Sequence, residues 1–481
     1  MRCVVFCMLA TLALGASIWS EERIQRFDND PKWEGHNNRV REKPRAVKQD
    51  FGYSKSNTLG GEAGAIDGWI TAAAEPAYYA KKLNAKTLND PLSASGRLIV
   101  KSRQCHLLVG FFNSKTVNEW RTANSIAIRI LGRSERFFAY VEYATSQWRA
   151  GGDTPGGFAL EKEADTGRMN LRGFPAQVVL QWSLRYDPNG NNGTGSIVVT
   201  IGKETSICHL DKGHKADGAT FDRFGMLPVL KSADDGGEVW LDDLTIGGRK
   251  EDLSSDPMWD GHNNRRAYET KNVRPWFNFG YSPTNFCGGT TPGELGGLVF
   301  RGDCRHANKL ASYGDRLSAL SLDKPLKASG KVALRRAVSD STTLLGFYHS
   351  TDSLQVNRSQ SSGIPRSFLG VAVEGPSREG FLFYPIYRTR GDGQGYASAD
   401  KAPHILPDGK VHDWSLEYDP AANTGRGRIV VRFDRQSVAL DLPENDRKSS
   451  TQFDRFGLVT TWIDGNGQQV YFDELKYTHR Q

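Results

Sequence analysis

The fold is decided by Trp182-Ser-Leu-Arg-Tyr-Asp-Pro188, which is followed by a turn rich in asparagine and glycine and then by Ser196-Ile-Val-Val-Thr-Ile201. Two β-prone runs on either side of such a turn predict a hairpin. The same order returns as Trp414-Ser-Leu-Glu-Tyr-Asp-Pro420 and Arg428-Ile-Val-Val-Arg-Phe433. The hairpin is therefore present twice in the chain.

The repeat extends from the hairpin in both directions. Phe221-Asp-Arg-Phe-Gly225 recurs as Phe453-Asp-Arg-Phe-Gly457, and the motif that begins at Trp33 recurs at Trp259. Each copy is far longer than a solenoid repeat of about 20 to 50 residues. The sequence therefore predicts a tandem duplication into two similar domains, residues 21–248 and 254–481.

The motif Trp33-Glu-Gly-His-Asn-Asn-Arg39 and its second copy, Trp259-Asp-Gly-His-Asn-Asn-Arg265, contain polar residues that suit catalysis. A folding role explains the agreement between the copies better. Gly and Asn are common turn formers, so we expect a clasp in which Trp packs under the turn and Arg ties backbone carbonyls.

The first 20 residues have the order of a secretory signal peptide. Arg2 precedes an apolar run from Val4 to Leu14, and small residues follow. The run is shorter than the roughly 20 residues that span a membrane. We therefore expect a protein that is secreted or periplasmic and has no transmembrane segment.

The charge pattern argues against nucleic acid as a partner. The net charge is +7, but 62 basic and 55 acidic residues are mixed along the chain, whereas nucleic-acid binders concentrate positive charge on one face. Four cysteines lie beyond the predicted signal peptide, and either two intradomain disulfides or buried free thiols fit them. They are Cys105, Cys208, Cys287 and Cys304.

The hydrophobic pattern within each copy has period two. Ile126, Ile128 and Ile130 alternate with other residues, as do Leu369, Val371 and Val373, which is typical of strands with one face toward a core. The only stretch that suggests a helix is the short region from Ala72 to Lys82. Short strands without alternating helices predict an all-β protein in which each copy is a two-sheet antiparallel sandwich.

The hairpin, the Phe-Asp-Arg-Phe-Gly strand and a closing strand with an Asp near its end together resemble the second half of a concanavalin A-like lectin/glucanase jelly roll. The laminin G-like modules belong to this superfamily. The closing strands are Glu238-Val-Trp-Leu-Asp-Asp-Leu244 and Gln469-Val-Tyr-Phe-Asp-Glu-Leu475. The resemblance covers the last third of each copy and implies two tandem antiparallel jelly-roll sandwiches, while members of the superfamily differ in function.

The familiar hydrolase of this fold is excluded by its motif. Retaining glucanases need two carboxylates about 5 to 5.5 Å apart on one face, and no Glu-x-Asp-x-Glu or Glu-x-Asp-x-x-Glu occurs in the sequence. The test leaves open a lyase or an unfamiliar pair of carboxylates.

Charged and aromatic residues that the first copy does not match gather in the second copy. Arginine binds carboxylates in a fork and tyrosine stacks on sugar faces, so these residues suit a glycan groove if their strands are neighbours. Alternatively, they form surface charge pairs, which contribute little. The candidates are Glu294, Arg301, Asp303, His349, Glu374, Arg378 and Tyr384.

The resemblance also implies a structural Ca2+. Jelly rolls of this kind often hold the ion with an aspartate of the last strand and backbone carbonyls, and Asp242 and Asp473 match that aspartate. The alternative is that both residues cap the final strand.

We therefore expect a secreted protein that engages polysaccharide, with carbohydrate binding through a groove mainly in the second domain. A polysaccharide lyase or glycoside hydrolase of the same fold is the second hypothesis, and a structural or adhesion protein of the extracellular space is the third. An enzyme should bring an Arg, a Tyr or His and a carboxylate together in one groove. A binding protein should present exposed aromatic residues without that convergence.

Overall fold

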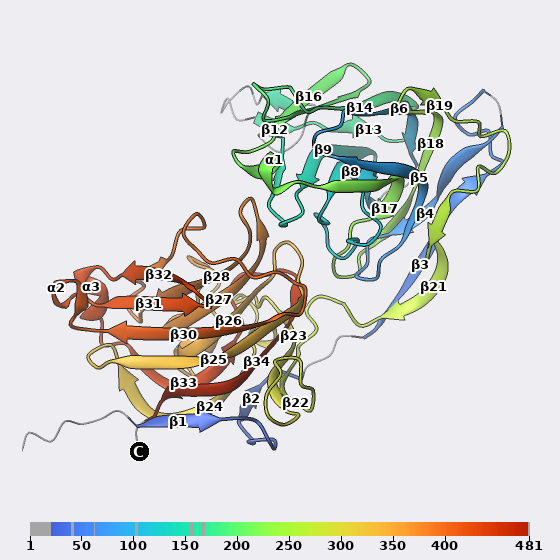
Figure 1. Ribbon diagram of the computed structural model, residues 1–481. Coiled ribbons are helices and arrows are strands. Elements are labelled where there is room, and N and C mark those ends of the chain that lie inside the picture. The colour runs from blue at the N-terminus through green and yellow to red at the C-terminus, as the bar shows by residue number, and fades with distance from the viewer. Residues whose placement is uncertain are drawn as a thin grey trace, which may run out of the picture.

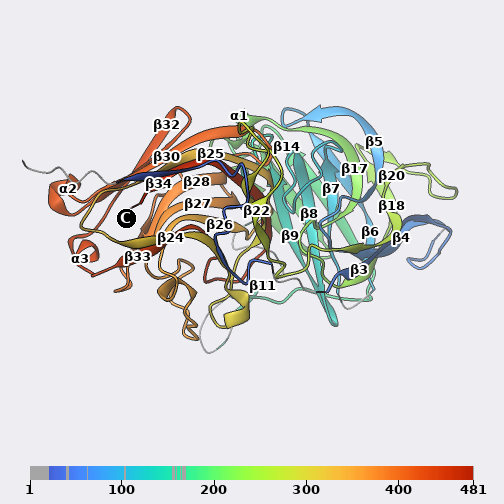
Figure 2. The same ribbon diagram turned by 90° about the horizontal axis from the view of Figure 1, so that it is seen from below.

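Strands dominate the computed structural model, which describes residues 21–479 except 40–42, 62, 102–103, 154–157, 159, 163 and 165–168. The strands form four large sheets, and the strands of each sheet pair in antiparallel fashion (Figures 1 and 2). The protein is therefore all-β and consists of two sandwiches, as the period-two pattern predicts. The predicted signal peptide lies outside the described residues, and no helix within them is long and apolar enough to cross a membrane.

The first sandwich stacks two sheets around one core. In spatial order, one sheet contains β16 (Glu204–His209), β15 (Ser196–Ile201), β14 (Leu180–Asp187), β6 (Leu92–Val100), β18 (Gly236–Ile246), β4 (Ala65–Thr71), β3 (Arg45–Ser54) and β21 (Arg265–Thr270), with β19 (Arg249–Lys250) beside β18. The other, the β7–β9 sheet, contains β10 (Ala150–Gly152), β9 (Arg136–Ala144), β8 (Ser125–Arg133), β7 (His106–Phe112), β17 (Thr220–Pro228), β5 (Tyr78–Thr87) and β20 (Asp260–His262), with β13 (Phe174–Pro175) beside β9. A separate ribbon pairs β11 (Leu160–Lys162) with β12 (Met169–Leu171), and α1 (His214–Asp217) is a single turn.

The second sandwich repeats this arrangement around its own core. One sheet contains β32 (Gln436–Asp441), β31 (Arg428–Phe433), β30 (Val411–Asp419), β25 (Leu326–Arg336), β34 (Gly467–Thr478), β23 (Glu294–Phe300) and β22 (Asn278–Ser282), with β1 (Glu22–Gln25) beside β34. The other, the β26–β28 sheet, contains β29 (Gln394–Tyr396), β28 (Gly380–Arg388), β27 (Phe368–Ser377), β26 (Thr342–Tyr348), β33 (Gln452–Val459), β24 (Ser312–Ser321) and β2 (Glu34–His36). The helical turns are η1 (Ala307–Lys309), η2 (Asp352–Leu354), α2 (Ala422–Gly425) and α3 (Glu444–Arg447).

Each sandwich is completed by a clasp that carries the Trp-x-Gly-His-Asn-Asn-Arg motif. The internal clasp, residues 249–265, follows the last long strand of the first sandwich and pairs with it and with β5. The N-terminal clasp, residues 22–39, crosses to the second sandwich, where β1 pairs with β34 and β2 pairs with β24. Figure 1 shows these blue strands beside the yellow and red strands of the second sandwich.

The side chains of the motif hold the clasp as the sequence predicts, and in both sandwiches the backbone that they hold is distant in sequence. Asn38 and Arg39 donate to the carbonyls of Phe279 and Tyr281, both at 2.6 Å. The internal clasp makes the matching bonds from Asn264 and Arg265 to Phe51 and Tyr53. The Asn and Arg of each motif thus hold a neighbouring strand, which fits a folding role for the clasps.

Strand pairing divides the chain differently from the sequence repeat. The repeat places the boundary between residues 248 and 254, whereas the strands of the internal clasp and β21 belong to the sheets of the first sandwich. The first sandwich thus runs from β3 to β21, and the second runs from β22 to β34 and is closed by the N-terminal clasp. The two divisions differ because each copy of the motif pairs with the sheets that it meets in space. For the N-terminal copy these are the sheets of the second sandwich.

The predicted strands and their core faces are present. Ile126, Ile128 and Ile130 of β8 are buried in the first core, and Leu369, Val371 and Val373 of β27 are buried in the second. The helix expected between Ala72 and Lys82 is wrong, because residues 72–77 form a loop and residues 78–82 begin β5. Within the described residues the four cysteines are buried free thiols, so the second reading of the cysteines holds.

Polar contacts join the two sandwiches. Buried Glu119 of the first sandwich accepts a hydrogen bond from the backbone N–H of Ser339 at 3.3 Å. Arg336 donates to the carbonyl of Ala74 at 2.8 Å. Ser232 donates to Asn466 at 2.9 Å. These contacts fix side chains of one sandwich against the other.

The stability of this junction should depend on pH through Glu119. Burial raises the pKa of its carboxyl from 4.5 to about 8, so between these values the folded protein binds more protons here than the unfolded chain does. Stability is then lost as pH rises through this window. We expect the melting temperature to fall less between about pH 5 and about pH 8 in Glu119→Gln than in the wild type. An equal fall of the melting temperature with pH in both proteins would contradict the raised pKa of Glu119.

Candidate functional site

A pocket of about 410 Å³ lies on the β26–β28 sheet. Phe383 of β28 packs toward Trp414 and Phe433 of the opposite sheet, so its neighbour Tyr384 points to the other face because side chains alternate along a strand. Glu374 of β27 and Arg301, which follows β23, also line this pocket. The pocket thus brings together three of the predicted residues.

The three residues form a chain of polar contacts. The hydroxyl of Tyr384 donates to Oε2 of Glu374 at 2.5 Å. Nη2 of Arg301 lies 3.6 Å from Oε1 of the same carboxylate, and Nε of Arg301 donates to Thr342 at 2.9 Å. Burial and the Glu374 carboxylate raise the pKa of Tyr384 well above 10. Tyr384 therefore keeps its proton, and Glu374 is held by a donor on each side.

Apolar side chains form most of the pocket wall, and one aromatic ring stands in solvent beside it. Leu344, Leu382 and Ile386 line the floor around the polar residues. Tyr396 of β29 also lines the pocket and is 63% exposed. A small polar cluster inside an apolar wall is the usual composition of a ligand site.

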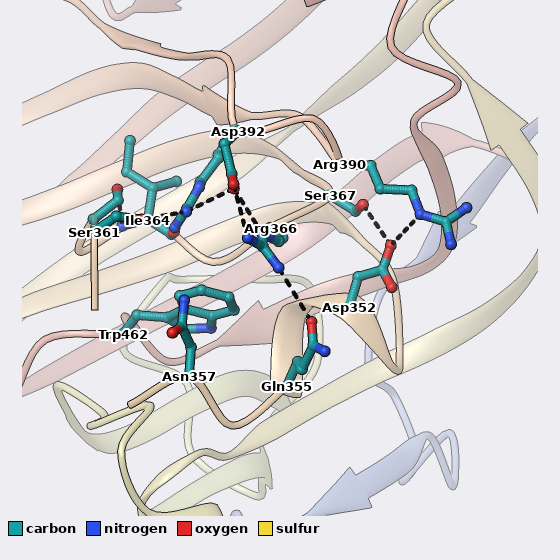
Figure 3. A network of polar contacts seen from close by, with 12 residues as sticks. Asp352, Gln355, Asn357, Ser361, Ile364, Arg366, Ser367, Arg390, Asp392 and Trp462 are labelled. Atoms are coloured by element: carbon teal, nitrogen blue, oxygen red, sulfur yellow. Dashed lines mark hydrogen bonds and ion pairs between the residues drawn. The ribbon is translucent and has the colours of Figure 1, made fainter. Parts of the chain in front are cut away.

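One wall of the pocket is held by a buried arginine network, shown in Figure 3. Arg388 donates to the carbonyl of Ile364 at 2.8 Å and pairs with Asp392 at 2.7 Å. Arg366 holds both oxygens of Asp392, at 2.6 and 2.7 Å. Trp462 lies under the Arg388 guanidinium, 4.9 Å from it. Because Ile364 lines the pocket, this network sets the position of the wall.

Glu294 and Asp303 were predicted for the same groove but are used elsewhere. Glu294 is fully buried and accepts hydrogen bonds from the N–H groups of Phe286 and Cys287, which fixes the loop before β23. Asp303 is also buried and pairs with both sides of the Arg305 fork, which lowers the pKa of its carboxyl. Both carboxylates therefore hold local backbone or a neighbouring side chain.

His349 and Arg378 also lie away from the pocket lining. Nδ1 of His349 accepts hydrogen bonds from the N–H groups of Thr351 and Asp352, both at 3.3 Å, and so closes the turn after β26. Arg378, in the turn between β27 and β28, pairs with Asp211 of the first sandwich at 2.8 Å. Its role here is at the junction between the sandwiches.

A polar cluster on the β7–β9 sheet was missed in the sequence. Arg129 of β8 pairs with Glu142 of β9 at 2.6 Å, and its guanidinium lies 3.9 Å from the centre of the Tyr140 ring. His106 of β7 lies 3.2 Å from Arg129, and burial together with nearby cations lowers its pKa well below 6.5. The signal was present, because Arg129 and Glu142 interrupt apolar strands.

The surroundings of Asp242 do not fit the predicted calcium ion. Arg97 donates to the Asp242 carboxylate at 3.1 Å and to the carbonyls of Leu59 and Gly60 at 2.8 and 2.7 Å. An aspartate and two backbone carbonyls are the ligands that Ca2+ would use. Here the guanidinium of Arg97 already forms hydrogen bonds with all three. A second cation beside Arg97 would be repelled.

Asp473 remains the better calcium candidate. It is fully buried, and its Oδ2 has no hydrogen-bond partner among the described residues. Lys331 donates to the carbonyl of Gly288 at 3.4 Å, and a Cβ on the next residue, Gly289, would stand 2.0 Å from Oδ2 of Asp473. An orphaned carboxylate oxygen beside a backbone carbonyl suits a hard cation, although Lys331 competes for the same place.

Calcium dependence should therefore reside in the second sandwich. If Asp473 binds Ca2+, chelation lowers the melting temperature and added Ca2+ restores it, because a ligand of the folded state stabilises by mass action. Asp473→Asn should remove this response, while Asp242→Asn should leave it intact. A melting temperature that changes neither with a chelator nor with added Ca2+ would refute the calcium proposal.

Comparisons with known proteins give distant structural likenesses. The laminin alpha1 chain of mouse, domains LG4-5, aligns over 91% of this chain and 93% of its own at 10% identity and a TM-score of 0.23. The endo-beta-1,4-glucuronan lyase of the fungus Trichoderma reesei and the carbohydrate recognition domain of Emp47p each cover 44% of this chain, and 94% and 92% of their own, at 10% identity and TM-scores of 0.27.

No protein-family model and no curated protein matches the sequence. Strand order and pairing thus define the class to which the chain belongs, that of all-β proteins built from two antiparallel sandwiches.

Proposed function

We propose that this protein binds polysaccharide through the pocket on the β26–β28 sheet, after export by the predicted signal peptide. The observation that carries the proposal is the exposed ring of Tyr396 at the mouth of a mainly apolar pocket that also holds the paired polar groups of Arg301 and Glu374. The tandem duplication predicted from the sequence would then have produced two sandwiches of which the second carries this pocket.

The chemistry of the pocket suits sugar hydroxyls. A hydroxyl both donates and accepts, and the pair of Arg301 and Glu374 offers donors and acceptors within 3.6 Å of each other. Tyr396 offers an exposed aromatic face on which the apolar face of a sugar ring can pack. The apolar walls exclude water, which strengthens the hydrogen bonds made between them.

Cleavage of the bound polysaccharide is the second candidate. It is favoured by the meeting of an arginine, a tyrosine and a carboxylate in one pocket, the arrangement expected of an enzyme. Because the raised pKa of Tyr384 keeps its hydroxyl protonated, this residue cannot act as a general base in the unliganded site. Elimination needs a base at the sugar carbon, so substrate binding would first have to break the bond between Tyr384 and Glu374.

The test is a binding screen with laminarin, xylan, mannan, alginate and pectin. Glu374→Gln removes the charge but keeps the shape, and we expect at least about tenfold weaker binding, equal to about 1.4 kcal/mol. Glu417→Gln is the matched control, because Glu417 is an ion-paired residue of β30 in the opposite sheet. The melting temperature should be the same in both variants.

The same samples distinguish binding from cleavage. New reducing ends report hydrolysis, and both reducing ends and ultraviolet absorbance of unsaturated products report elimination. Binding without products supports the first candidate, and products that disappear in Glu374→Gln support the second. A screen in which no polysaccharide binds or reacts would refute both.

A further inference from the structure

A second pocket, of about 490 Å³, lies between the two sandwiches. His106, Trp120 and Arg129 line it from the first sandwich, and Asp340 and Asn466 line it from the second. The Trp120 ring packs edge-on against His106, with their centres 5.0 Å apart. Nδ1 of His106 and Nε1 of Trp120 have no hydrogen-bond partner among the residues that the structure describes.

The two pockets occupy the same end of equivalent sheets. In the first sandwich His106 of β7 is paired with Leu131 of β8, and in the second Thr342 of β26 is paired with Glu374 of β27. These four residues line their respective pockets. The strand order around both pairs is the same. Each sandwich therefore builds a pocket from the same part of its fold.

The pockets also adjoin each other. Arg301 lines the first pocket, Asp340 lines the second, and Nη1 of Arg301 lies 4.0 Å from Oδ1 of Asp340. The backbone N–H of Arg301 donates to the carbonyl of Asn466, which is another residue of the second pocket. Residues that line the two pockets are thus in direct contact.

Most of the charged side chains of both pockets are paired within the protein. Four cationic side chains and three carboxylates line the second pocket. Lys231 pairs with Asp234 at 2.7 Å and Arg129 pairs with Glu142 at 2.6 Å, as Arg301 pairs with Glu374 in the first pocket. Such pairs leave little net charge to attract a polyanion, while they retain donors and acceptors for hydroxyl groups.

We propose that the two pockets are subsites of one track that binds a neutral, linear polysaccharide across both sandwiches. This inference rests on the proposed function and adds its ligand class and a second point of contact. A chain long enough to reach both pockets gains contacts that a short oligosaccharide lacks, without a second loss of translational freedom.

The experiment compares the disaccharide and the octasaccharide of laminarin, xylan or mannan, whichever polymer binds best in the screen. Arg133 is an exposed residue that lines only the second of these pockets. We expect Arg133→Glu and Trp120→Ala to weaken octasaccharide binding at least about tenfold and to leave disaccharide binding unchanged. Arg249→Glu, an exposed arginine of β19, is the matched control.

The outcomes separate this inference from the proposed function. Glu374→Gln should weaken the binding of both sugars. If the wild type binds the disaccharide and the octasaccharide equally, or if Arg133→Glu and Trp120→Ala bind the octasaccharide like the wild type, the track is refuted while the first pocket stands. Preferred binding of alginate or pectin would overturn the neutral ligand class. If no sugar binds, both proposals fail.

Discussion

Trp33→Ala should destabilise the second sandwich by about 3 to 5 kcal/mol, although the residue lies near the start of the chain. Trp33 is 9% exposed and belongs to the second core. Its ring lies 5.2 Å from Phe27 and 6.2 Å from Tyr477 of β34. Replacing it by alanine leaves a cavity that the surrounding strands cannot fill without moving.

Hydrogen exchange measured by mass spectrometry locates the effect. We expect faster exchange in β24 and β34, and unchanged exchange in β17 and β18 of the first sandwich. Trp259→Ala is the matched variant, because Trp259 stacks on Tyr79 of β5 at 5.9 Å. Its loss should affect the first sandwich, and to a smaller degree, since Trp259 is only partly buried. Loss of protection in the first sandwich on replacing Trp33 would contradict the strand pairing.

Gly293→Ala should prevent the N-terminal clasp from docking. Gly293 has a φ of +138°, and a Cβ at this position would stand 1.9 Å from the carbonyl oxygen of Phe27. The backbone conformation alone costs about 1 to 3 kcal/mol in a residue with a side chain, and the clash must also push the clasp away. We expect a total loss of at least about 3 kcal/mol.

Denaturant unfolding gives the measurement, and Gly60→Ala gives the control. Gly60 has a φ of +76°, but a Cβ at this position would meet no atom within 4 Å, so only strain is added there. Gly64→Ala should repeat the large effect in the first sandwich, because its Cβ would stand 1.7 Å from the carbonyl oxygen of Leu253 in the internal clasp. Equal losses for Gly60→Ala and Gly293→Ala would show that the contact with the clasp is unimportant.

The strands were predictable because their pattern is local. Alternation in β8 and β27 places apolar residues on one face whatever the rest of the chain does. A local pattern could not predict which sandwich each clasp pairs with. The motifs at Trp33 and Trp259 are almost identical, and so are the Phe-Gly-Tyr-Ser segments that they hold. Local chemistry therefore permits either pairing, and only the path of the chain decides between them.

The candidate site could be predicted in part for the same reason. Glu374 lies on the face of β27 opposite the core aliphatics, so alternation placed it in the groove. Glu294 and His349 are equally polar, but loop N–H groups take their acceptor atoms. Tyr396 was missed because it comes from a short strand at the edge of the sheet. Its position depends on pairing with β28, which no local pattern reveals.

Closure by the N-terminal clasp has a consequence for the order of folding. During synthesis residues 22–39 are made before either sandwich, but Glu22 pairs with Thr478, so strand β1 must wait for the last strand of the second sandwich. The first sandwich, which is continuous from β3 to β21, can form in the meantime, as domains do when they fold as units from the N-terminus. The late step closes a very long loop, which slows folding. Until then the clasp is an unpaired strand, and a chaperone that shields such strands should raise the yield of folded protein more than it raises the final stability.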